Sequence, residues 1–186
     1  GHDLAEAHAP LILERNGLRI ALLAYVEFKP RAFEAGAGTP TALYNAMIHP
    51  LVPFAIRGAI WYQGESNHNE GFVYTDKKKA LLASWRSVFQ QPELPFYFVQ
   101  IAPYQYGTED EEILAQFWQA QRKCLDIPHT GMAVISDIGE IPDIHPAKKK
   151  EVARRLSLWA LSQTYGRSEI DPNGPLYASH SIEGAA

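Results

Sequence analysis

The stretch Ala59-Ile60-Trp61-Tyr62-Gln63-Gly64-Glu65-Ser66-Asn67 changes character in its middle. Its first part continues an apolar run that begins near Ile56, and this pattern predicts a buried strand. Its second part is a dense polar cluster at the C-terminal end of that strand. Ligands of open α/β sheets bind outside the carboxyl ends of the strands, so residues 63–67 are a candidate site. A simple turn is the alternative interpretation, although Gln and Glu are poor turn formers.

The chain around this stretch alternates between apolar runs and amphipathic runs. The apolar runs predict strands and the amphipathic runs predict helices with Thr75 or Asp76 as one N-cap and Thr108 with Glu111 as a capping box. The order β, α, β, α, β, α predicts an α/β fold, a three-layer sandwich with a short, mainly parallel sheet. The expected strands are 55–62, 95–101 and 132–136, and the expected helices are 75–90, 108–125 and 147–165.

The N-terminal part has a different pattern. Two apolar runs between Pro10 and Tyr25 flank Asn16-Gly17, which is a strong signal for a β-hairpin. Residues 29–38 are expected to form a loop, and a helix is expected from Thr41 until the prolines near Pro53 end it. Three strands make a thin sheet, so we expect the hairpin to contribute edge strands.

Composition excludes several classes of protein. The chain has 186 residues and a net charge of −4, which gives no indication of binding to nucleic acid or to an anionic membrane. The apolar run from Ile20 to Val26 is too short to span a bilayer. The single cysteine, Cys124, excludes an internal disulfide and a cysteine-only metal site. The histidines show no metal-ligand spacing, so no metal or cofactor is expected, and the localisation stays unknown.

His145 is the second candidate of interest. It lies in the loop 137–146, between the third expected strand and the last helix, which places it at the same sheet edge as residues 63–67. Asp143 lies two residues before it, and prolines restrict the loop, so His145 could act as a general base held by a carboxylate. The alternative is an ordinary loop histidine beside a helix start.

From about Pro40 to Gly184 the chain resembles the sialate O-acetylesterase family of carbohydrate esterases, in the SGNH hydrolase superfamily. The similarity rests on the strings Pro40-Thr-Ala-Leu-Tyr-Asn-Ala-Met-Ile48, Gly58-Ala-Ile-Trp-Tyr-Gln-Gly-Glu-Ser-Asn67, Gly131-Met-Ala-Val134, Asp143-Ile-His-Pro146, Glu151-Val-Ala-Arg-Arg-Leu156 and Gly174-Pro-Leu-Tyr177. The resemblance implies hydrolysis of acetyl esters on sialic acid or another sugar by a serine nucleophile and a histidine base, without a metal. It implies that His145 is the base, with Asp143 as its acid partner and Asp137 as the substitute for Asp143. It also implies that the block Gln63, Gly64, Glu65, Ser66 and Asn67 lines the oxyanion and substrate site.

The chain departs from this family at the nucleophile. The family's serine lies in a block well before the equivalent of Pro40, but residues 1–39 contain no serine. Ser66 matches a family serine that is not the nucleophile. We therefore expect a truncated SGNH-like domain that is weakly active or inactive alone. The alternative is a non-catalytic folded chimera, which could form homo-oligomers through an exposed sheet edge.

Residues 1–38 resemble a different family, the poly-gamma-glutamate capsule-biosynthesis metallophosphatases. The matching strings are Pro10-Leu-Ile-Leu-Glu-Arg-Asn-Gly-Leu-Arg-Ile-Ala-Leu-Leu-Ala-Tyr25 and Glu27-Phe-Lys-Pro-Arg-Ala-Phe-Glu-Ala-Gly36. This segment carries none of that family's metal-binding clusters. The expected organisation is thus an N-terminal hairpin segment, 1–38, joined near Gly38 to the distal part of an esterase domain, 39–186.

Overall fold

The computed structural model describes residues 11–15, 18–22, 45, 48–174, 178–181, 183 and 184. It forms two compact units, Gly1–Leu51 and Val52–Ala186. In the first unit, β1 (Leu11–Arg15) pairs antiparallel with β2 (Leu18–Leu22), and Arg15 lies opposite Leu18. This pairing confirms the predicted hairpin around residues 16–17. The predicted loop 29–38 and most of the predicted helix from Thr41 lie outside the described residues, and His49–Leu51 forms a 3₁₀ turn, η3.

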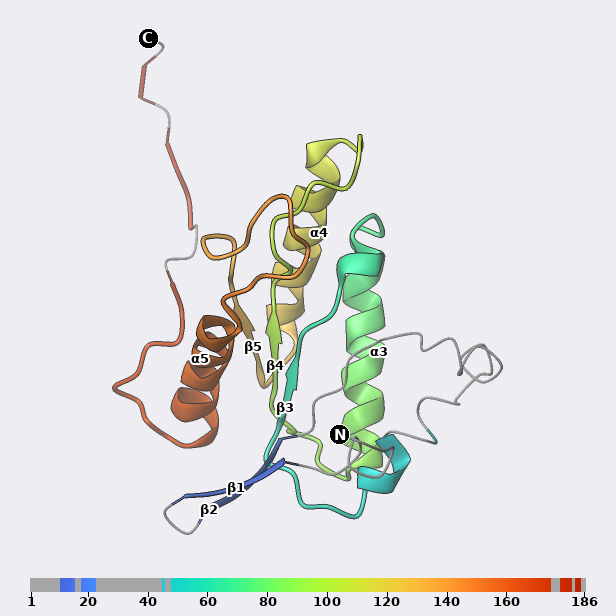
Figure 1. Cartoon of the computed structure of the whole chain (residues 1–186), viewed down its shortest axis with the longest axis vertical. Helices are drawn as coiled ribbons and strands as arrows, with labels where there is room; N and C mark the ends of the chain where they lie inside the picture. Colours follow the sequence, from blue (N-terminus) through green and yellow to red (C-terminus); the bar gives the residue numbers. More distant parts are fainter. Residues whose placement is uncertain are drawn as a thin grey trace. The chain divides into compact units, whose positions relative to one another are not determined.

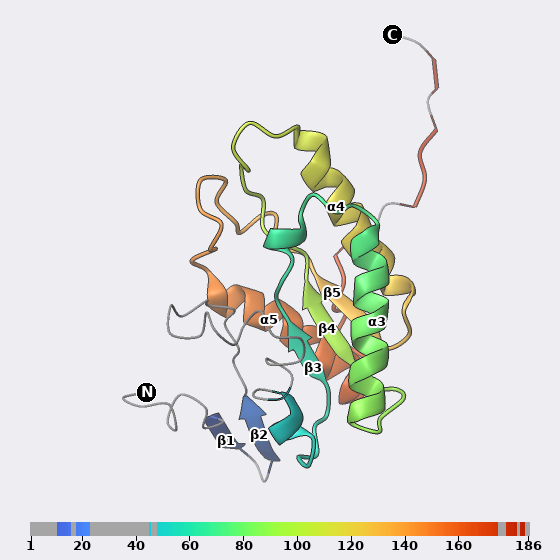
Figure 2. The same cartoon turned by 90° about the vertical axis from the view of Figure 1, so that its right-hand side faces the viewer.

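The hairpin was expected to extend the main sheet, and this expectation is wrong for the described strands. The strands β1 and β2 form a two-stranded sheet of their own, because their backbone groups pair with one another. The second unit contains a separate parallel sheet in the order β3-β4-β5. Its strands are β3 (Ala59–Trp61), β4 (Phe96–Val99) and β5 (Thr130–Ala133). They lie side by side and point the same way (Figure 2).

Helices cover both faces of this parallel sheet, as the alternating element order predicted (Figure 1). Alternate β4 residues point to opposite faces. Phe96 and Phe98 pack with α3 (Val73–Val88), α4 (Glu111–Lys123) and the 3₁₀ turn η5 (Cys124–Asp126) on one face. Tyr97 and Val99 pack with α5 (Lys149–Trp159) on the other, and a π-helical turn, η6 (Ala160–Thr164), continues α5. The fold is therefore a small α/β sandwich with three layers.

The contact between α5 and the sheet depends on a glycine in β5. A Cβ atom at Gly131 would lie 2.3 Å from the indole of Trp159. The Trp159 indole nitrogen donates a hydrogen bond of 3.0 Å to the carbonyl of Met132, and the ring stacks on Tyr97. Val152, Leu156 and Trp159 recur at helical spacing and are all buried, so this apolar stripe is the side of α5 that faces the core.

Two predicted helix caps are wrong. The helix α3 begins at Val73, before Thr75, and the Thr75 hydroxyl instead donates a buried hydrogen bond of 2.9 Å to the carbonyl of Ala120. The helix α4 is capped by Asp110, whose carboxylate accepts from the backbone N–H of Glu112, so Thr108 is not the cap. No helix in the described part of the chain is both long and apolar enough to cross a membrane.

Candidate functional site

The chain turns sharply at Gly64, directly after β3. Gly64 has φ 153°, and a Cβ atom there would lie 3.0 Å from the Cγ2 atom of Ile101 and 3.2 Å from the ring of Phe117. Only glycine fits this backbone and this space. The turn leads into a short 3₁₀ helix, η4 (Glu65–Asn67), whose last N–H donates to the carbonyl of Gly64. The polar block is thereby held at the carboxyl end of the sheet.

Hydrogen bonds fix the side chains of Gln63 and Asn67. The amide nitrogen of Gln63 donates to the Oδ1 atom of Asn67 at 2.6 Å, and the Asn67 amide donates to Glu70 at 2.9 Å. The hydroxyl of Tyr74, on α3, donates to the backbone carbonyl of Gln63 at 3.0 Å and lies 3.4 Å from its side-chain oxygen. An amide nitrogen carries two protons, so Gln63 keeps one donor beyond its bond to Asn67. Ser66, in the same turn, is exposed.

The carboxyl group of Glu65 interacts electrostatically with several neighbouring side chains. Burial raises the pKa of the Glu65 carboxyl, while its backbone hydrogen bonds and the charges of Lys149 and His145 oppose that shift. Lys149, at the start of α5, places its Nζ atom 5.1 Å from the ring centre of Tyr62. Burial, followed by the charge of Glu65, raises the pKa of the Tyr62 hydroxyl. The rise in the pKa of the Glu65 carboxyl is therefore limited both by backbone groups that follow β3 and by charged side chains that follow β5.

Tyr106 joins the loops that follow the three strands. Its ring stacks on His68 at 3.6 Å, and His68 follows β3. The neighbouring Gln105 N–H donates at 3.2 Å to the carbonyl of Ile141, which follows β5. Burial, with the charge of Glu65 second, raises the pKa of Tyr106 to about 12. The Tyr106 hydroxyl is buried and has no hydrogen-bond partner among the described residues.

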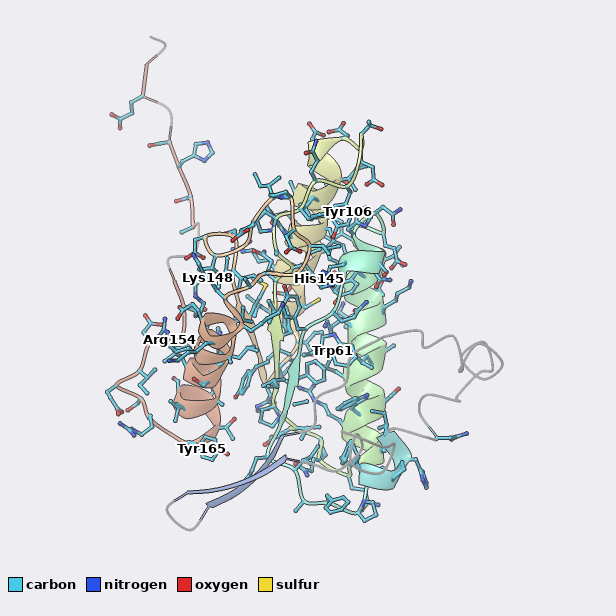
Figure 3. All side chains as sticks on the ribbon, in the orientation of Figure 1. Trp61, Tyr106, His145, Lys148, Arg154 and Tyr165 are labelled. Carbon is cyan, nitrogen blue, oxygen red and sulfur yellow. The ribbon has the colours of Figure 1, made fainter. Side chains whose placement is uncertain are left out.

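His145 lies at the same end of the sheet as Tyr106 (Figure 3). Its side chain is 83% exposed, and its Nδ1 atom lies 3.7 Å from the Oδ1 atom of Asp143. That same oxygen accepts a hydrogen bond of 2.8 Å from the backbone N–H of His145. Asp137 is held differently, because Arg155 donates to both of its oxygens at 2.6 and 2.7 Å. Those bonds lower the pKa of Asp137 to about 2, so this carboxylate is already paired.

A pocket of about 210 Å³ lies beside β3 and α3, lined by Trp61, Gln63, Asn67, Tyr74, Lys77, Lys78 and Leu81. Lys78 is 3% exposed, and its Nζ atom has no hydrogen-bond partner among the described residues. The rings of Trp61, Tyr74, Phe96 and Phe98 surround this nitrogen at 4.9 to 5.6 Å. Burial lowers the pKa of Lys78 to about 8. Figure 3 shows Trp61 between the sheet and α3.

Three residues near the site were not singled out from the sequence. Gln121, on α4, is fully buried and bonds the backbone of Val99 and Ile101 at the end of β4. Its position on the apolar side of a helix is a signal that could have identified it. Tyr106 lies in a polar and aromatic loop after a strand, and Lys149 lies in a run of three lysines, a pattern that is typical of a solvated helix face. Their common signal is their place at the carboxyl edge of the sheet.

Among the described residues, no group of three or more His, Cys, Asp or Glu side chains could hold a metal ion. Cys124 is buried, and its thiol donates to the carbonyl of Ala120.

Comparison with known proteins gives one consistent result. Residues 29–153 match the family model described as carbohydrate esterase, sialic acid-specific acetylesterase. The sialate O-acetylesterase of Rattus norvegicus is 36% identical over 162 residues, and the human protein is 32% identical over 159 residues; each match covers 76% of this chain. A carbohydrate acetylesterase from Xanthomonas citri has a similar solved structure, with a TM-score of 0.65 and 43% identity over 69% of this chain.

These comparisons do not show the metallophosphatase resemblance of residues 1–38. The chain spans about 30% of the length of the curated relatives and 31% of the Xanthomonas chain. Its small α/β fold with a three-stranded parallel sheet is consistent with a truncated SGNH-like domain. With two thirds of its residues inside the matching model, the chain belongs to the sialic acid-specific acetylesterase family of carbohydrate esterases.

Proposed function

We propose that this chain carries the distal part of a site that hydrolyses acetyl esters on a sugar, with His145 as the general base. The observation that supports this proposal is the meeting of His145, Glu65 and the Gln63–Asn67 block at one sheet edge. An exposed imidazole can accept the proton of an attacking hydroxyl. The free N–H of Gln63 can donate to the oxyanion that develops on the acetyl carbonyl.

The acid partner of His145 has two candidates in this proposal. Asp143 is the partner that the resemblance favours, and its Oδ1 atom lies 3.7 Å from Nδ1 of His145. Glu65 is a second candidate, because its charge and that of His145 interact. Glu65 is half-buried whereas Asp143 is exposed, so a charge on Glu65 is less screened by water. Asp137 contributes least, since Arg155 occupies both of its oxygens.

We further propose that the chain alone is weakly active or inactive, because residues 1–39 contain no serine and the family's nucleophile block is missing. Loss of one member of a catalytic triad still leaves residual catalysis from the oxyanion site. We also propose that residues 1–38 are a metallophosphatase-like segment that is fused to the esterase part near Gly38. That segment carries no metal cluster by sequence, so we assign it no phosphoesterase activity.

The test is labelling with a fluorophosphonate serine probe, peptide mapping, and turnover of 4-nitrophenyl acetate. The variants are His145→Ala and, as a control outside the site, His129→Asn, since Asn tolerates the positive φ of 58° at that position. We expect no labelled serine and slow turnover that falls with His145→Ala but not with His129→Asn. Labelling of the exposed Ser66 with turnover that depends on His145 would show that the chain has its own nucleophile.

A non-catalytic scaffold is the second candidate function. The observation in its favour is the exposure of an apolar residue on a terminal strand. Ile60 lies on β3, at the end of the described parallel sheet, and is 56% exposed. A strand with an unpaired edge can pair with another chain. This proposal predicts a homo-oligomer that forms in the absence of any sugar. A monomer at all concentrations in size-exclusion chromatography, with His145-dependent turnover, would exclude it.

A further inference from the structure

A buried lysine lies beside the pocket between β3 and α3. Lys78 is 3% exposed, and its Nζ atom forms no hydrogen bond with any described residue. Aromatic rings surround this nitrogen, and they hold a cation without neutralising its charge. Buried ammonium groups are normally paired and hydrogen-bonded. Lys78 therefore lacks the acceptor that a buried ammonium requires.

No negative charge in the described part of the chain compensates the Lys78 ammonium. Burial lowers the pKa of Lys78, and the only titratable group among the described residues that acts on it is the thiol of Cys124. Burial raises the pKa of that thiol, so Cys124 is uncharged at neutral pH. The preceding residue, Lys77, differs because its ammonium binds Glu70 at 2.6 Å. The positive charge of Lys78 is thus available to a bound anion.

The pocket that Lys78 lines contains further donors and no carboxylate among its described residues. The residues that line it are Trp61, Gln63, Asn67, Tyr74, Lys77, Lys78 and Leu81. The indole Nε1 atom of Trp61 is buried without a hydrogen-bond partner among the described residues. Gln63 keeps one amide proton beyond the one that it donates to Asn67. Unused donors without an acidic side chain favour a ligand that accepts hydrogen bonds.

The pocket also has apolar walls. The side chain of Trp61 lies between the sheet and α3 (Figure 3), and Leu81 follows Lys78 by three residues, which places both on one side of the helix. An inorganic anion gains nothing from such walls, whereas an alkyl chain gains free energy by covering them. The chemistry of the pocket therefore favours an anion with a short apolar tail.

We propose that this pocket binds a short-chain monocarboxylate, whose carboxylate pairs with the Lys78 ammonium and whose alkyl chain lies against Trp61 and Leu81. The Nζ atom is covered in the structure, and the flexible four-carbon stem of lysine lets it turn toward a ligand in the pocket. The pairing is a charge-assisted hydrogen bond, which satisfies the buried ammonium. This site does not depend on the ester hydrolysis proposed above.

The test compares butyrate with butyramide, which has nearly the same shape but no charge. Binding to the whole chain is followed by ¹H–¹⁵N spectra, through the backbone amides of Tyr74 and Lys78, and by the rise in melting temperature with ligand concentration. We expect both effects with butyrate and neither with butyramide. Lys78→Met should bind butyrate about ten- to hundredfold more weakly, the loss expected for a hydrogen bond to a charged group.

Lys79→Met is the matched control, because it removes the same charge from the same helix at a position outside the pocket lining. It should bind butyrate as wild type does. A hydrophobic residue in place of a buried, unpaired charge is expected to preserve folding, so weaker binding by Lys78→Met would not reflect unfolding.

Three outcomes would overturn the proposal. One is equal binding of butyrate and butyramide, or no binding of either. Another is an equal loss of affinity in Lys78→Met and Lys79→Met, since the effect would then come from net charge. The last is competition by chloride or inorganic phosphate that is as strong as competition by a second carboxylate such as propionate, because the pocket would then bind anions without regard to their apolar part.

Discussion

Two neighbouring strands of one sheet, β3 and β4, have very different environments. Every residue of β4 is buried, with Phe98 fully inaccessible, whereas the middle residue of β3, Ile60, is 56% exposed. Ile60 lies opposite Tyr97 in register, and so faces the side of the sheet where Trp159 of α5 packs on Tyr97, but Ile60 itself stays exposed. The difference shows that the core is centred on β4 and β5, while β3 contributes mainly the site at its carboxyl end.

The largest expected effect comes from truncating the centre of β4. Phe98→Ala leaves a cavity between the sheet, α3 and α4, and should lower the free energy of unfolding by about 3–5 kcal/mol. Urea denaturation followed by tryptophan fluorescence measures the change. Ile60→Ala on β3 is the control and should lower the free energy of unfolding by under about 1 kcal/mol. Similar losses in both variants would refute the contrast between the strands.

The next effect is a gain in stability. Lys78 lies under both strands, and its amine has no hydrogen-bond acceptor among the described residues. Replacing it by Met at pH 7 should raise the free energy of unfolding by up to about 3 kcal/mol. This is the free energy that corresponds to the lowering of the Lys78 pKa from its ordinary value of 10.5 to about 8. Calorimetry or urea denaturation measures the gain. Lys79→Met, at an exposed position of the same helix, is the control and should change little.

The pH dependence of this effect has a definite sign. The folded-state pKa of Lys78 lies below its ordinary value, so the unfolded chain holds the proton more tightly. Below about pH 8 the protonated amine of Lys78 lowers the free energy of unfolding by its full amount. This loss of stability becomes smaller as the pH rises from about 8 to about 10.5. Wild type should gain stability relative to Lys78→Met across that interval. Parallel pH profiles for the two proteins would contradict a buried, unpaired ammonium.

An intermediate effect is expected at the turn that ends β3. Gly64→Ala places a Cβ atom against Ile101 and Phe117 and forces alanine into a backbone conformation that favours glycine. The strain should lower the free energy of unfolding by roughly 1–3 kcal/mol. Gly174→Ala, where a Cβ atom would meet nothing within 4 Å, is the control for the same measurement. A neutral Gly64→Ala would mean that this turn can relax.

The smallest effect on stability is expected at the exposed side of β3. Ile60→Lys should change the free energy of unfolding by less than about 0.5 kcal/mol, because the side chain is already in solvent. If β3 pairs with a second copy, this charge should shift an oligomer to monomer in size-exclusion chromatography. An oligomer that survives the substitution would place the contact elsewhere.

The sequence predicted most of this fold because its patterns are local. The buried run of β4 and the helical spacing of the apolar residues in α3, α4 and α5 are visible in the sequence alone. The burial of β4 and of Leu82, Phe117 and Leu156 agrees with them. Helix starts were less predictable: Thr75 has the right chemistry for a cap but is used in a tertiary hydrogen bond to Ala120. That bond joins residues far apart in the chain, and no local pattern records it. The separate hairpin sheet is a further case, because strand pairing between distant segments is also non-local.

The location of the candidate site at the sheet edge could be predicted from the sequence, but the contacts between its side chains could not. The polar block after β3 and the loop that contains His145 were both assigned to the carboxyl edge of the sheet, where the structure has them. The sequence could not show that Arg155 pairs with Asp137, or that Lys149 reaches Tyr62. Both contacts depend on the side of α5 that faces each loop. The roles given to these residues remain predictions that the proposed substitutions test.

The ring stack between His68 and Tyr106 has a consequence for motion. The loop after β4 is joined to the loop after β3 by this stack, and to the loop after β5 by the hydrogen bond from Gln105 to Ile141. A displacement of the middle loop must therefore disturb both of its neighbours. Fluctuations that admit solvent there are cooperative, and amide protons in all three loops would become exchangeable in the same opening event.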